Sequence, residues 1–173
     1  MKRALRFAGA LVAALLLHLI GTRLLPQWPL IIDLMLIVVV FNALDGSTMS
    51  GMIGGLFAGW ASDALTGQAF GLFGLVDTII GYTAAYAVQR IVIQRPAGAA
   101  LLFSLASACQ QGLVLGLSFL LLNAPEVPAY PWLLVKAGTT GLLGATLFFG
   151  RQRLLNRVDL WRHTRKTRIR LER

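Results

Sequence analysis

Long uninterrupted apolar blocks constrain the fold of this chain more than any other feature of its sequence. Several of them approach the roughly 20 residues that a helix needs to cross a bilayer. Of the 173 residues, 57% are hydrophobic and only 13% are charged, which is too few charges to cover the surface of a soluble domain of this length. The sequence therefore predicts an all-α integral membrane protein without a separate soluble domain.

Six apolar blocks are expected to form a compact bundle of about six transmembrane helices over residues 1–150, followed by a basic tail over 151–173. The predicted spans are 7–24, 29–44, 49–65, 70–89, 98–122 and 132–150. The first block follows basic residues as a signal peptide does, but no small-residue cleavage site comes after it, so we expect it to be retained. The third block is short, and five spans would result if it were re-entrant.

Basic residues occupy alternate connections between these blocks, except the one at Asp45, which carries none. If the N-terminus is inside, the inner segments carry Lys2, Arg3, Arg6, Arg90, Arg95 and the whole tail. The outer segments carry Arg23 and Glu126 and few other charges. Because positive residues are retained on the cytoplasmic side of a membrane, we expect both termini to be cytoplasmic.

The tail holds nine of the sixteen basic residues against two acids. Next to a membrane span, this charge favours contact with anionic lipid over nucleic acid, which we do not expect as a partner. An amphipathic helix at the inner interface is predicted near the start of the tail. The residues expected at the membrane surface are Arg151, Arg153, Arg157, Trp161, Arg162, Arg165 and Lys166. A solvated topology anchor, or a dock for an acidic cytoplasmic partner, would also explain these charges.

Three glycines, Gly51, Gly55 and Gly59, are spaced by four residues, and Asp63 continues the series. On a helix these four positions lie on roughly one face. Small residues allow helix backbones in lipid to approach closely. The series therefore predicts tight packing against another helix, inside the chain or in a homodimer. Similar spacing later in the chain predicts dense packing within the bundle, at Gly112, Gly116, Gly138, Gly141 and Gly144.

Three acids, Asp33, Asp63 and Asp77, fall within or beside the predicted spans, where an ionisable group is costly and marks a functional or structural contact. Asp63 precedes the turn sequence Leu-Thr-Gly-Gln, so we expect it to accept hydrogen bonds from backbone amides at a helix junction. Asp33 is expected near the outer interface. Asp77 is the deepest, and Lys136 is the basic candidate to pair with it.

Catalytic and metal-binding patterns are absent from the sequence. The two histidines, His18 and His163, are far apart, and the single cysteine, Cys109, has no second ligand at metal-binding spacing. No Gly-rich phosphate loop is present either. We therefore expect neither an enzyme nor a cofactor. A proton path through the three acids and polar residues such as Gln110 and Gln111 is a minor alternative. It is disfavoured because the chain lacks the internal repeats of secondary transporters.

The segment over residues 30–90 resembles the bacterial rod shape-determining MreD family. The resemblance rests on LIIDLMLIVVVFNAL, GMIGGLFAGWASDALTGQAFGLFGL and IIGYTAAYAVQR. Within it, Gly59, Asp63, Gly67 and Gly71 repeat at four-residue spacing and Gly81-Tyr82 follows. One departure is Ile32, which stands where the family often has proline before the acid. The residues expected to serve helix packing or partner binding are Asp33, Gly51, Gly55, Gly59, Asp63, Gly67, Gly71, Asp77, Gly81 and Tyr82.

The resemblance implies a non-enzymatic scaffold of the bacterial cytoplasmic membrane that supports lateral peptidoglycan synthesis and cell shape. It implies an MreC-like membrane protein as partner and, through it, the RodA glycosyltransferase, a class B penicillin-binding protein and MreB filaments. The family is also similar in architecture to substrate-binding subunits of energy-coupling-factor vitamin transporters, and substrate capture is the alternative function. Such a subunit needs polar or aromatic groups around an outward-facing cavity, whereas the outer loops here carry few of them.

Overall fold

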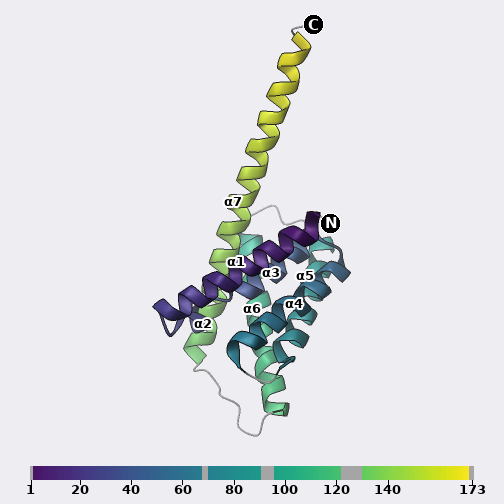
Figure 1. The fold of residues 1–173 in the computed structure, drawn as a ribbon. Helices are drawn as coiled ribbons and strands as arrows, with labels where there is room; N and C mark the ends of the chain where they lie inside the picture. The colour runs from purple at the N-terminus through teal and green to yellow at the C-terminus, as the bar shows by residue number, and fades with distance from the viewer. Residues whose placement is uncertain (1, 68–69, 91–95, 122–129, 172–173) are drawn as a thin grey trace.

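The computed structural model describes residues 2–67, 70–90, 96–121 and 130–171, and all of its regular structure within these ranges is helical (Figure 1). The helices are α1 (Lys2–Leu24), α2 (Trp28–Ile31), α3 (Leu34–Asp45), α4 (Thr48–Thr66), α5 (Leu72–Arg90), α6 (Pro96–Leu121) and α7 (Tyr130–Leu171).

The lengths of these helices confirm an all-α membrane protein. Among the described residues, three helical segments are long and apolar enough to cross a bilayer by themselves, at Arg3–Leu24, Ala97–Leu121 and Pro131–Leu154. The α3 helix is apolar but has only 12 residues. The count of six spans therefore stays a prediction, although each predicted block contains at least one helix.

The second predicted block, 29–44, is not one continuous helix, and this corrects the sequence-based expectation. Pro29 lies in the single turn of α2, which ends at Ile31. Ile32 and Asp33 are extended, with φ values of −137° and −111°. Asp33 then begins α3, because its side chain accepts a hydrogen bond from the Leu36 amide, the usual chemistry of an N-cap.

The expected boundary at residue 150 is likewise not a break in the backbone. The α7 helix runs without interruption from Tyr130 through the predicted tail to Leu171 and extends beyond the bundle (Figure 1). The predicted start of the third block agrees better with the structure: the Ser47 hydroxyl accepts the Ser50 amide at 3.3 Å and caps α4.

The α3 helix lies at the centre of the bundle. Leu36, Val39 and Val40 are completely buried there. The main apolar cluster consists of Leu36, Ile37, Val40, Val76, Ile80, Phe103 and Ala106, from α3, α5 and α6. The α4 and α5 helices form an antiparallel pair on one side of α3, α6 pairs with α7, and α1 lies obliquely across the bundle (Figure 1). A short central helix is thus enclosed by longer ones.

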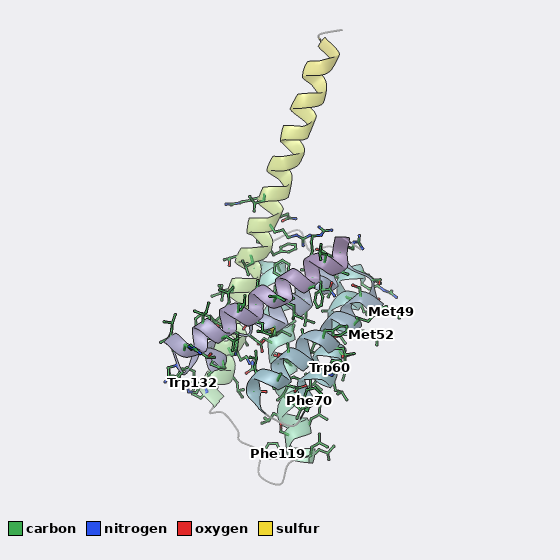
Figure 2. All side chains as sticks on the ribbon, viewed as in Figure 1. Met49, Met52, Trp60, Phe70, Phe119 and Trp132 are labelled. Carbon is green, nitrogen blue, oxygen red and sulfur yellow. The ribbon has the colours of Figure 1, made fainter. Side chains whose placement is uncertain are left out.

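The two ends of the bundle differ in chemistry. The N-terminus of α1 and the projecting part of α7 are at the same end (Figure 1). At that end Arg151 pairs with Asp45 through contacts of 2.7 and 2.8 Å. Phe70, Phe119 and Trp132 lie toward the other end (Figure 2). One end therefore carries an arginine–carboxylate pair, and several large aromatic side chains lie toward the other.

Candidate functional site

The most distinctive local structure is the glycine seam, which we define as Gly51, Gly55 and Gly59 on α4. These residues face the backbone of α5 within the same chain. A Cβ atom at Gly51 would collide with the carbonyl oxygen of Gly81, and one at Gly59 would lie 2.6 Å from Cα of Gly74. A Cβ at Gly55 would lie 2.5 Å from the carbonyl carbon of Asp77. Only hydrogen fits at these positions, so the two backbones are in direct contact.

Asp63 joins the end of α4 to the beginning of α5. Its carboxylate accepts the amides of Gly71 at 2.9 Å, Phe73 at 2.9 Å and Gly74 at 3.1 Å. These amides belong to the cap and first turn of α5, where backbone donors have no partner inside the helix. The side chain is 2% exposed. The expected hydrogen bonding to amides at a helix junction is therefore observed, and a negative group is also favoured by the α5 dipole.

The turn between these helices depends on two glycines with left-handed backbone conformations. Gly67 has φ of 64° and Gly71 has φ of 98°. The Gly67 amide donates to the Asp63 carbonyl and ends α4. A Cβ atom at either glycine would meet nothing within 4 Å. Gly67 and Gly71 therefore do not take part in helix packing, although they continue the four-residue spacing, because the helix has already ended.

Asp33 holds the entrance of α3 against α7. One carboxylate oxygen lies 3.0 Å from Nζ of Lys136, and the other accepts the Leu36 amide at 3.0 Å. The Asp33 amide itself donates to the Thr140 hydroxyl at 3.2 Å, and Thr139 donates to the carbonyl of Ile31. Asp33 is only 8% exposed. This site is an ion pair between the buried Asp33 and the partly buried Lys136, and it anchors the break between α2 and α3.

Asp77 has a different partner from the predicted one. The expected pairing with Lys136 is wrong, because Lys136 contacts Asp33 instead, at 3.0 Å. Asp77 is completely buried, and its Oδ1 atom accepts Gln110 Nε2 at 2.7 Å. Asp77 Oδ2 and Gln110 Oε1 have no hydrogen-bond partner among the described residues. Gln110 lies in an apolar run of α6 beside a second glutamine, and the sequence indicated it as part of a proton path rather than as a partner of Asp77.

The face of α4 opposite the seam is exposed and aromatic. Phe57 and Trp60 meet edge to face with 5.8 Å between ring centroids, and Phe70 stacks on Trp60 at 6.4 Å. The exposed residues at helical spacing on this face are Met49, Met52, Ile53, Phe57 and Trp60. Met49, Met52, Trp60 and Phe70 follow one another along this side of the molecule (Figure 2). We call this surface, with Phe70 included, the α4 outer face.

Gly81 and Tyr82 point in different directions. Gly81 lies in the contact with Gly51, where a Cβ atom would collide with the backbone. Tyr82 is 44% exposed and stacks on Tyr86, which in turn lies under the Arg90 guanidinium at 5.2 Å. Only the glycine of this pair contributes to helix packing.

The later glycines divide into two groups. Gly141 and Gly144 face α6, where added Cβ atoms would collide with Ser104 and Phe103. Gly112, Gly116 and Gly138 have nothing within 4 Å of an added Cβ atom. The predicted dense packing is wrong at these three, because the corresponding helix faces are turned away from the bundle.

The basic residues are described only in part. Arg151 pairs with Asp45, and Arg153 is exposed. Five further side chains that were predicted at the membrane surface are not among those that the structure describes: Arg157, Trp161, Arg162, Arg165 and Lys166. Among the described residues, no group of three His, Cys, Asp or Glu side chains could hold a metal ion.

Two cavities accompany these sites. A cavity of about 130 Å³ is lined by Gln110, Gln111, Trp132 and Lys136. It is smaller than the roughly 300–1,000 Å³ of most small-molecule sites. A groove of about 530 Å³ lies at the basic end, between α1, α3 and α7. Asp33 and Asp63 each anchor a helix end, whereas Asp77 joins the middle of α5 to α6 through Gln110.

One of three comparisons with known proteins found a match. The family model described as rod shape-determining protein MreD matches residues 2–125, which include α1 to α6 and all three acids. A search among curated proteins found no match. A search among solved structures found none either, so the similarity to vitamin-transporter subunits stays a prediction. The match spans well over half of the chain, and the protein therefore belongs to the MreD family of rod shape-determining membrane proteins.

Proposed function

We propose that this chain is a non-enzymatic scaffold subunit of the bacterial cell-elongation complex, binding an MreC-like membrane protein through the α4 outer face. The single observation that carries this proposal is the two-sided construction of α4. One side is fixed to α5 by the glycine seam and by Asp63. The other side exposes Phe57 and Trp60 at 49% and 42%.

The α4 outer face is held rigidly against α5, which makes it suited to bind a partner protein. Trp60 lies against Gly74, where an added Cβ would be 2.7 Å from its Cδ1 atom. The ring therefore rests on the first turn of α5, at the point where Asp63 accepts the Gly74 amide. Aromatic anchors held in one position lose little conformational entropy when they bind a partner. A single membrane-crossing helix could lie along such a face.

The same proposal places both termini in the cytoplasm, with six membrane-embedded segments in the cytoplasmic membrane of a bacterium. It is supported by Arg3, Arg6 and Arg151, which line one groove at the basic end of the bundle. We infer that an MreC-like partner links the chain to a RodA-type glycosyltransferase, a class B penicillin-binding protein and MreB. Anionic lipid at the basic tail and a homodimer are further proposed contacts.

The test is a mild-detergent pull-down from native membranes, with mass spectrometry of bound proteins and small molecules. We expect an MreC-like protein to be recovered with the wild type, and its recovery to fall with Asp63→Leu and Trp60→Ala at normal protein levels. Leu101→Ala is the matched control, because Leu101 is also a large exposed hydrophobic residue, 62% exposed, but lies on α6.

Two results would contradict the proposal. Full recovery of the partner with Trp60→Ala would show that the α4 outer face is not the binding surface. Recovery of transporter ATPases together with a vitamin-sized ligand would show that the chain captures a substrate instead. Melting temperatures of the purified variants separate lost binding from lost structure, since Trp60→Ala leaves every hydrogen bond of Asp63 in place.

A further inference from the structure

The groove at the basic end has a gradient from charged to apolar along each of its three walls. On α1, Arg3 and Arg6 at the rim give way to Phe7 and then Ala10. On α7, Arg151 at the rim is followed one turn deeper by Leu147. The α1 and α7 helices run in opposite directions, yet these arginines of both lie at the same end of the molecule (Figure 1).

The third wall, α3, shows the same gradient. Asp45 is nearest the basic end, Phe41 lies one turn deeper along α3, and Ile37 lines the groove two turns from Asp45. At 1.5 Å per residue, the eight positions from Asp45 to Ile37 correspond to a depth of about 12 Å. The groove is therefore a slot with a polar mouth and an apolar interior.

The charge at the mouth selects an anion. Three arginines and a single carboxylate, Asp45, line the groove. Guanidinium groups bind phosphate oxygens in bidentate fashion. Arg151 is already paired with Asp45 at 2.7 Å, but both side chains are partly exposed, at 36% and 47%. A phosphate at the mouth could therefore share this arginine in competition with Asp45.

We propose that this groove binds one anionic phospholipid of the membrane leaflet at the basic end. The headgroup phosphate lies among Arg3, Arg6 and Arg151, and an acyl chain enters between Phe7, Phe41 and Leu147. A volume of about 530 Å³ accommodates part of a lipid, within the roughly 300–1,000 Å³ of ligand sites. The lipid fills the space between α1 and α7 and joins these helices across α3.

This proposal differs from general attraction of the basic tail to acidic membranes. A diffuse surface effect depends on the number of positive charges near the membrane and falls off within a Debye length. A built site depends on particular arginines and on free space beneath them. Charge and space can be changed separately here, which makes the two explanations distinguishable.

The experiment is native mass spectrometry of the full chain in mild detergent, titrated with phosphatidylglycerol and, in parallel, with phosphatidylcholine. We expect a single tightly bound phosphatidylglycerol, with affinity reduced about fivefold by Arg3→Gln, from about 1 kcal/mol per basic residue near an anionic surface. Arg153→Gln is the matched control, because Arg153 is exposed on α7 and does not line the groove. We expect it to leave the affinity unchanged.

Two further variants test the site without loss of positive charge. Ala10→Trp fills the apolar part of the groove and should reduce lipid retention. Asp45→Asn removes the competing carboxylate and should increase the affinity for phosphatidylglycerol, a gain that misfolding would not produce.

Three results would overturn the proposal. Equal losses with Arg3→Gln and Arg153→Gln would show a diffuse charge effect. Undiminished binding with Ala10→Trp would show that no acyl chain enters the groove. Displacement of the lipid by inorganic phosphate at similar concentration would identify a simple anion site.

Discussion

Replacing Gly55 with alanine should destabilise the protein far more than the same substitution elsewhere in its helices. The added Cβ would lie 2.5 Å from the carbonyl carbon of Asp77 and 2.9 Å from Cα of Thr78. These are backbone atoms, so no side-chain rotation relieves the collision. The carbonyl oxygen of Asp77 is closer still, and ordinary contact begins at 3.4 Å, so α5 must move away from α4 by at least about 0.9 Å.

A displacement of this size has a calculable cost. A radial gap of 0.5–1 Å forfeits roughly a quarter to a half of each dispersion contact, and overpacking in a core typically costs about 1–3 kcal/mol. The helices are also held at their junction by Asp63, so they cannot separate freely. We expect a loss of about 2–3 kcal/mol, or about 4–12 °C in melting temperature for a chain of this size.

The assay is thermal unfolding of purified variants in mild detergent, followed by tryptophan fluorescence. Gly116→Ala is the matched control, since Gly116 lies within α6 and its added Cβ meets nothing within 4 Å. Alanine is favoured over glycine in a helix by about 0.5–1 kcal/mol, so the control should be unchanged or more stable. A melting temperature for Gly55→Ala within a degree of the wild type would refute the proposed packing, as would an equal loss with Gly116→Ala.

Three further substitutions can be measured with the same melting assay. Lys136→Met should cost about 3–5 kcal/mol, because it leaves the Asp33 carboxylate buried without its cation. The double variant with Asp33→Asn should regain part of this loss. If the stability losses of the two single variants simply add in the double variant, the ion pair does not contribute. Asp77→Asn should be neutral or stabilising, because an amide can accept from Gln110 Nε2 and also donate to Gln110 Oε1, which has no partner among the described residues. Asp77→Leu should instead cost about 1–3 kcal/mol. Equal effects of the two substitutions would exclude this explanation. Gly67→Ala should cost about 1–2 kcal/mol through its φ of 64° alone, and no change would mean that the turn adjusts without strain.

The sequence was most informative where one residue type has one physical use. Glycines repeated every four residues predicted close helix contact, and an aspartate before a turn predicted hydrogen bonds to backbone amides; both are seen at the α4–α5 pair. The all-helical membrane architecture followed from the apolar blocks in the same way. These features depend on the spacing of residues along the chain, which can be read directly from the sequence.

Contacts between distant helices could not be read from spacing. Gly112 and Gly116 have the same step of four as the seam, yet they face open space because α6 turns another side to the bundle. Lys136 was assigned to the wrong aspartate for the same reason: its partner depends on how α7 is rotated against α3. The break at Ile32 and Asp33 was hidden because both residues lie inside an apolar block.

The close pairing of α4 and α5 also has a consequence for how this part of the chain enters a bilayer. Among the described residues, only segments of α1, α6 and α7 are long and apolar enough to insert singly. The glycines that permit backbone contact also reduce the hydrophobicity of α4, and Asp63 would carry an unshielded charge until the first turn of α5 has formed. We therefore expect the two helices to leave the translocation machinery together as a hairpin, so that a ribosome stalled between them would leave α4 outside the membrane.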